Sequence, residues 1–119
     1  LQTSRAANPV VLTGDVHAFV VGRITEQAED SDSPTVASEF VATGISSNAR
    51  PQRLMDQWQR DNGNLQYCAG EKRGYLKLAL APKALQVELI AIDDVRRPDS
   101  SRSVLKRYTV EAGRPTILE

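Results

Sequence analysis

The sequence has 119 residues, of which 40% are hydrophobic and 25% are charged, the ordinary composition of one globular domain. Its 15 basic and 15 acidic residues cancel, so no basic surface for nucleic acid or anionic lipid is predicted. The longest apolar stretches fall far short of the roughly 20 residues that span a membrane. The single cysteine, Cys68, excludes an internal disulfide and is expected to be a small buried or half-buried residue.

The first predicted elements are two strands joined by a short connection. Residues 9–13 are apolar and β-branched without alternation, which is typical of a central strand covered on both faces. Residues 18–24 predict a second strand, in which Gly22 permits a bulge or a close approach of the backbone. The acidic stretch that follows, residues 25–34, lacks the glycine and glutamate spacing of an EF-hand, so it predicts a solvated loop.

The later elements are mainly strands, with one short helix between them. Residues 35–41 predict a strand ending near a loop at residues 44–48, where Ser46 and Ser47 shape the loop, because no nucleophile motif surrounds them. Apolar spacing predicts an amphipathic helix over residues 53–60. Alternation then predicts an antiparallel hairpin of residues 75–80 with 85–91, and a last strand over 103–110.

The most informative residues are Asp15 and His17, which follow Gly14 at the end of the first strand. His17 is the only histidine in the chain. In an extended backbone, residues two apart project from the same face, so both side chains could reach one metal ion. Two ligands do not complete a metal site. The alternative is structural, with His17 a partly buried strand residue and Asp15 a turn residue.

Several blocks of residues resemble, in this order, the C-terminal part of the PhoD-type alkaline phosphatases. They are Asn-Pro-Val-Val-Leu-Thr-Gly-Asp-Val-His at 8–17, Ser-Pro-Thr-Val-Ala-Ser-Glu-Phe-Val at 33–41, Gly-Ile-Ser-Ser at 44–47, Lys-Arg-Gly-Tyr at 72–75 and Asp-Val-Arg-Arg-Pro at 94–98. The resemblance covers most of the chain. It implies an α/β fold for residues 1–119 as a single unit, the C-terminal segment of a two-sheet calcineurin-like metallophosphoesterase sandwich, mostly β-strands with one short helix.

The resemblance also implies an activity, the hydrolysis of phosphate monoesters or diesters with iron and calcium as cofactors. In related phosphoesterases the matching motif is Gly-His-x-His, so Asp15 and His17 are carried over as metal ligands. The remaining ligands would lie on a missing N-terminal portion, the chief partner of this segment besides the phosphate ester. The isolated segment is therefore expected to be inactive and to self-associate through apolar surface. Export to the periplasm or the exterior is implied, although the first residues show no leader.

Other residues have assigned roles with open alternatives. Glu39 or Asp93 could accept a hydrogen bond from the second nitrogen of a ligating His17. Arg73 could contact a phosphate oxygen of the substrate, and the alternative is an outward-pointing arginine before a strand. The competing function for the whole chain is a non-catalytic β-rich interaction module in which Asp15 and His17 are structural.

Overall fold

The structure is a computed structural model that describes residues 6–119. Residues 1–5, on which the expectation about a leader falls, lie outside the described part. The elements are β1 (Val10–Thr13), β2 (Phe19–Thr25), β3 (Thr35–Val41), α1 (Gln52–Asp61), β4 (Leu65–Ala69), β5 (Arg73–Ala81), β6 (Ala84–Ile92), β7 (Arg102–Glu111) and β8 (Ile117–Leu118). Within residues 6–119, no helix has the length and apolar character needed to cross a membrane.

The first sheet has the strand order β1-β3-β2-β4. Strands β1 and β3 pair in parallel, while β2 pairs antiparallel with both β3 and β4. The register between β2 and β4 shifts between Val21 and Gly22, and the extra residue is Gln66 on β4, so the bulged strand is β4 rather than β2. At Gly22 itself the backbone approaches closely, because a Cβ atom there would lie 3.3 Å from the carbonyl oxygen of Asn64. These directions place the carboxyl ends of β1, β3 and β4 at one end of the sheet.

The second sheet has the strand order β5-β6-β7-β8. Its neighbours are all antiparallel. Strands β5 and β6 form the predicted hairpin, with the two-residue connection Pro82-Lys83 between paired Ala81 and Ala84. The strand predicted over residues 103–110 is confirmed as β7, but it is not the last strand, because β8 follows and pairs with it.

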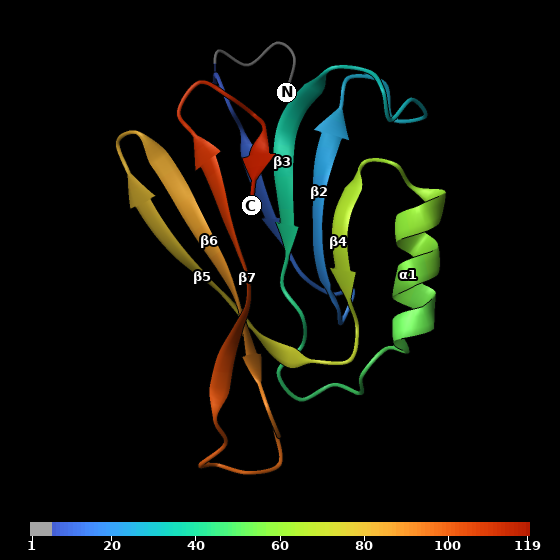
Figure 1. Cartoon of the computed structure of the whole chain (residues 1–119), viewed down its shortest axis with the longest axis vertical. Coiled ribbons are helices and arrows are strands. Elements are labelled where there is room, and N and C mark those ends of the chain that lie inside the picture. The colour runs from blue at the N-terminus through green and yellow to red at the C-terminus, as the bar shows by residue number, and fades with distance from the viewer. Residues whose placement is uncertain (1–5) are drawn as a thin grey trace.

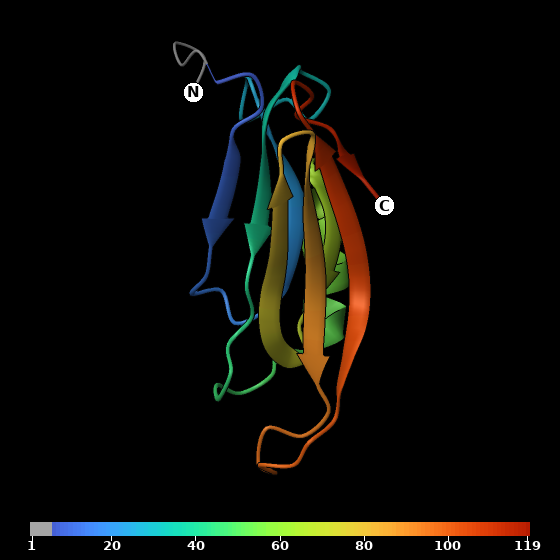
Figure 2. The ribbon, with the colours of Figure 1, turned by 90° about the vertical axis from the view of Figure 1, so that its left-hand side faces the viewer.

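The molecule has three layers, with the first sheet in the middle (Figures 1 and 2). Alternate residues of β2 divide between the two faces: Phe19 and Val21 pack toward the second sheet, whereas Val20 packs toward α1. The core between the sheets consists of Phe19, Val21, Phe40, Ala69, Val87, Leu89, Tyr108, Val110 and Ile117. The smaller core under α1 is centred on Met55, with Leu54 and Trp58 partly buried against it. The predicted apolar face of the helix is therefore confirmed.

Two expectations about the strands are corrected. Within residues 6–119, β1 is an edge strand with β3 as its one neighbour, and Leu12 and Thr13 are exposed, so it is not the doubly covered central strand expected. Strand β4 was not predicted, because its five residues include the polar Gln66 and show little periodicity. The strand forms because it pairs with β2 and contacts α1, and its own sequence does not indicate these partners.

Candidate metal centre

Three loops meet at the end of the first sheet where β1, β3 and β4 end. They are residues 14–18 after β1, residues 42–50 after β3, and residues 70–72 after β4. We call residues 14–18 the donor loop, because Asp15 and His17 lie on it. Figure 1 shows these connections at the same end of the molecule. Loops at strand carboxyl ends are where open sheets containing parallel strands commonly place their ligands.

The backbone of the donor loop is left-handed at both candidate ligands. The φ angle is 70° at Asp15 and 61° at His17. Our expectation of an extended backbone is therefore wrong, because the chain must turn sharply after Gly14 to bring antiparallel β2 back beside β3. Left-handed conformations are uncommon for residues other than glycine, although aspartate and histidine adopt them more readily than most. Such residues concentrate at functional sites.

Both candidate side chains face solvent. Asp15 and His17 are exposed, and within residues 6–119 neither side chain has a hydrogen-bonding or ion-pairing partner. His17 is not the partly buried strand residue of the structural alternative, whereas Asp15 does lie in a bend. No group of three or more histidine, cysteine, aspartate or glutamate side chains gathers in the described part of the chain. A carboxylate and an imidazole fit a metal by their chemistry, but as two donors they are a partial set.

Arg73, the first residue of β5, ties the three loops together from inside the protein. Its side chain is buried, with the residue 5% exposed. The Nη1 atom donates to the carbonyl oxygen of His17 at 3.0 Å, to Ser47 Oγ at 3.1 Å and to the Asn48 carbonyl at 3.3 Å. The Nη2 atom donates to the carbonyl of Gly70. Arg73 is therefore not the outward-pointing arginine of the alternative, and its phosphate contact stays a prediction.

Arg50 makes a second connection to the donor loop. Its Nε donates to the carbonyl oxygen of Val16, and its backbone N–H donates to the Gly70 carbonyl at 3.0 Å. The guanidinium lies 5.9 Å from the ring centroid of Trp58, within the range of a cation–π contact. Two arginines thus donate to consecutive carbonyls of one loop. No sequence signal pairs these arginines with the loop, because their partners are 34 and 56 residues away.

The side chains expected to support His17 have other partners. Glu39 accepts a hydrogen bond from Thr13 Oγ1 at 3.2 Å. Asp93 accepts one from Ser101 Oγ. Neither carboxylate bonds the imidazole within residues 6–119, so a role for either as its acceptor stays a prediction. Ser47 shapes its loop, as expected, through its bond with Arg73.

A polar hollow of about 600 Å³ adjoins these loops. Arg73 lines it and also donates to the carbonyl of His17, which links the hollow to the donor loop. Its walls come from residues 46–49 of the second loop, residues 71–73 before β5, and residues 92–96 after β6.

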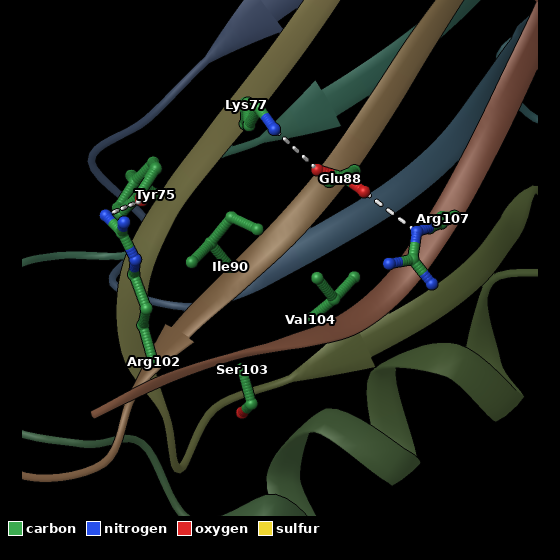
Figure 3. Close-up of a pocket in the computed structure, with 8 residues that line it drawn as sticks. All are labelled: Tyr75, Lys77, Glu88, Ile90, Arg102, Ser103, Val104 and Arg107. Atoms are coloured by element: carbon green, nitrogen blue, oxygen red, sulfur yellow. Dashed lines mark hydrogen bonds and ion pairs between the residues drawn. The ribbon is translucent and has the colours of Figure 1, made fainter.

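A separate hollow of about 560 Å³ lies on the second sheet and is lined by β5, β6 and β7 (Figure 3). Glu88 on β6 pairs with Lys77 on β5 at 3.2 Å and with Arg107 on β7 at 2.8 Å. Hydrogen bonds from Arg107 and, to a lesser extent, from Lys77 hold the pKa of Glu88 below its usual value. Tyr75 accepts a bond from Arg102. These side chains pair across strands, the usual way in which an exposed sheet face is stabilised.

The model of the PhoD-like phosphatase family matches residues 1–89, three quarters of the chain. The chain therefore belongs to the PhoD-like phosphatase family. Among curated relatives, alkaline phosphatase D of Bacillus subtilis (strain 168) is 29% identical over 114 residues. That alignment covers 93% of this chain and 19% of the relative.

A solved structure described as the structure of PhoD has the same fold. The two superpose with a TM-score of 0.84 at 25% sequence identity, over 98% of this chain and 23% of the solved chain. The chain thus spans about a fifth of the length of these relatives. The expected fold, two sheets that are mostly β-strand with one short helix, is confirmed as a fragment of the PhoD architecture.

Proposed function

We propose that this chain is part of a metal-dependent phosphoesterase that hydrolyses phosphate monoesters or diesters, in which Asp15 and His17 are metal ligands. One observation carries the proposal: in the donor loop, two neighbouring metal-capable side chains are exposed, unpaired within residues 6–119, and fixed on a left-handed backbone. Membership of the PhoD-like phosphatase family supports the class of reaction.

The two side chains have distinct tasks in this proposal. His17 donates a lone pair from a neutral imidazole, and Asp15 contributes an anionic oxygen that offsets the charge of the cation. Metal ions, when bound, polarise the phosphoryl oxygen and activate a water nucleophile. The remaining ligands come from residues outside those described, because the described part holds two suitable donors at this place and no larger group.

By analogy with the family, the metals are iron and calcium, the protein is exported, and the rest of the polypeptide is the partner that completes the centre. An isolated chain of these residues is then inactive. The polar hollow beside Arg73 is a space where the alcohol part of an ester could lie, since Arg73 lines it and donates to the carbonyl oxygen of His17 in the donor loop.

The test uses the complete polypeptide that carries this sequence. His17→Ala and Asp15→Ala should each lose bound metal, measured by elemental analysis. Turnover should fall at least about a hundredfold, because replacing even a residue that supports a metal ligand typically lowers metal affinity or activity about 10–100-fold. Aryl phosphate monoesters and diesters, assayed side by side, define the substrate class.

The matched control is Asp32→Ala, an exposed carboxylate in the loop between β2 and β3, with no side-chain partner in the described part. It should keep metal and turnover at the parental level. If His17→Ala and Asp15→Ala also keep both, the ligand assignment is wrong, and a non-catalytic β-rich module becomes the better interpretation of this chain.

A further inference from the structure

We infer that Arg50 and Arg73 are positioning residues that hold the donor loop in its left-handed conformation and so set the directions of Asp15 and His17. The importance of this clamp for catalysis rests on the proposed function, but the clamp itself is a property of the described residues. The clamp consists of the two guanidinium groups and the carbonyls of Val16, His17 and Gly70.

The donor loop needs an external restraint. Two left-handed residues within three positions cost about 1–3 kcal/mol each unless the surroundings fix them. Val16 and Ala18 pack in the core under α1, but Asp15 and His17 are exposed and Gly14 has no side chain, so apolar packing does not reach the side chains of the two left-handed residues. Hydrogen bonds from Arg50 and Arg73 to consecutive carbonyls supply that restraint at the two peptide groups that join Val16 to His17 and His17 to Ala18.

The two arginines are themselves fixed by the neighbouring loops. Arg73 bonds Ser47 and Asn48 of the second loop, and both arginines meet at the carbonyl of Gly70, through Nη2 of Arg73 and the backbone N–H of Arg50. A Cβ atom at Gly70 would lie 2.5 Å from the carbonyl oxygen of Arg50, so only glycine allows this approach. The clamp thus joins all three loops at the end of the first sheet.

The chemistry of the clamp favours a positioning role over a purely stabilising one. Arg73 is buried, its Nε atom has no partner within residues 6–119, and no carboxylate pairs with it there. Burying a charged group without an opposite charge is costly. Burial, and to a lesser extent the nearby Arg50, lowers the pKa of Arg73. A planar guanidinium can meet several carbonyls in one plane, which a lysine ammonium cannot reproduce.

The experiment measures the loop directly in the full 119-residue chain, isotope-labelled for NMR at low concentration. His17 is the only histidine, so its imidazole signals are unambiguous. Arg73→Lys and Arg50→Lys keep the positive charge but lose the planar set of N–H donors of the guanidinium group. We expect each to move the backbone shifts of Asp15 and His17 away from left-handed values, while signals from the core between the sheets stay in place.

The matched control is Arg107→Lys, an exposed arginine on β7 that pairs with Glu88 and has no contact with the donor loop. Its loop signals should equal those of the parent. Left-handed shifts that persist at both residues in a folded Arg50→Lys or Arg73→Lys protein overturn the inference. Should Arg73→Lys unfold, Arg50→Lys decides, because Arg50 is less deeply buried and stacks on the surface of α1.

A second measurement separates this inference from the proposed function. In the complete polypeptide, Mn²⁺ titration of the two lysine variants should give a dissociation constant about 10–100 times that of the parent, the usual cost of losing support around a metal ligand. A disturbed loop with unchanged Mn²⁺ affinity supports the clamp and counts against Asp15 and His17 as ligands. If the loop is undisturbed in the lysine variants, the clamp inference is wrong, and the ligand assignment is then decided by the His17→Ala test alone.

Discussion

At the scale of single residues, Asp15 and His17 show what a sequence motif can and cannot indicate. The Gly-Asp-Val-His block predicts a metal-binding loop, which stays a proposal, but an extended backbone was the wrong geometry for that loop. The conformation depends on donors that are distant in sequence, with Arg73 lying 56 residues after His17. A local pattern cannot show such partners, and so the role of Arg50 was not predicted.

Cys68 gives a prediction at the same scale. Burial, with a smaller contribution from Asp56, raises the pKa of the Cys68 thiol to about 11, whereas an unfolded cysteine titrates near about 8.5. Between these values the unfolded chain releases a proton that the folded chain keeps, so the free energy of unfolding falls as the pH rises. The slope from this one group is at most about 1.4 kcal/mol per pH unit.

Urea unfolding between pH 8 and pH 10 measures this loss, with Cys68→Ala as the comparison. The variant should be less stable at pH 8 but should lose less stability as the pH rises. The pKa values of Tyr67 and Tyr108 are also raised, mainly by burial, so both proteins lose further stability from these groups above about pH 10. Parallel pH profiles for parent and variant would show that Cys68 titrates normally.

At the scale of elements, local patterns predicted α1 and the β5–β6 hairpin, because the information for each lies within a few residues. Apolar positions at helical spacing mark the face of α1 that carries the buried Met55, and the alternation of β5 continues across a two-residue turn into β6. Strand β4 was missed because its residues show little periodicity, and β8 was missed because it is only two residues long. Each forms a strand because it pairs with a longer neighbour, β4 with β2 and β8 with β7.

Gly74 on β5 gives a prediction for the second sheet. A side chain there would collide with the carbonyl oxygen of Ile90 on β6 and would lie 3.1 Å from the Cα atom of Ala91. Gly74→Ala should therefore reduce the free energy of unfolding by about 1–3 kcal/mol, the usual cost of overpacking. Gly14→Ala is the control, because nothing lies within 4 Å of a Cβ atom at that position. Equal losses in both variants would exclude the collision as the cause.

At the scale of the whole molecule, the two sheets and the helix form a layered unit whose edges are partly open. An apolar hollow of about 570 Å³ lies between β1 and the β5–β6 hairpin, and the adjoining Leu80 is 85% exposed. This surface is consistent with a chain that spans about a fifth of its relatives, and self-association of the isolated chain stays a prediction. The layered arrangement was implied by family resemblance, since periodicity alone predicted strands without their order.

The complete polypeptide, crystallised with its metals, offers the most direct measurement of the donor loop. Anomalous diffraction locates the metal ions independently of any assumption about ligands. We predict a metal peak within about 2.0–2.6 Å of an imidazole nitrogen of His17 and of a carboxylate oxygen of Asp15, the range that covers transition-metal and calcium ligands. Metal peaks that all lie beyond bonding distance of both side chains would contradict the account.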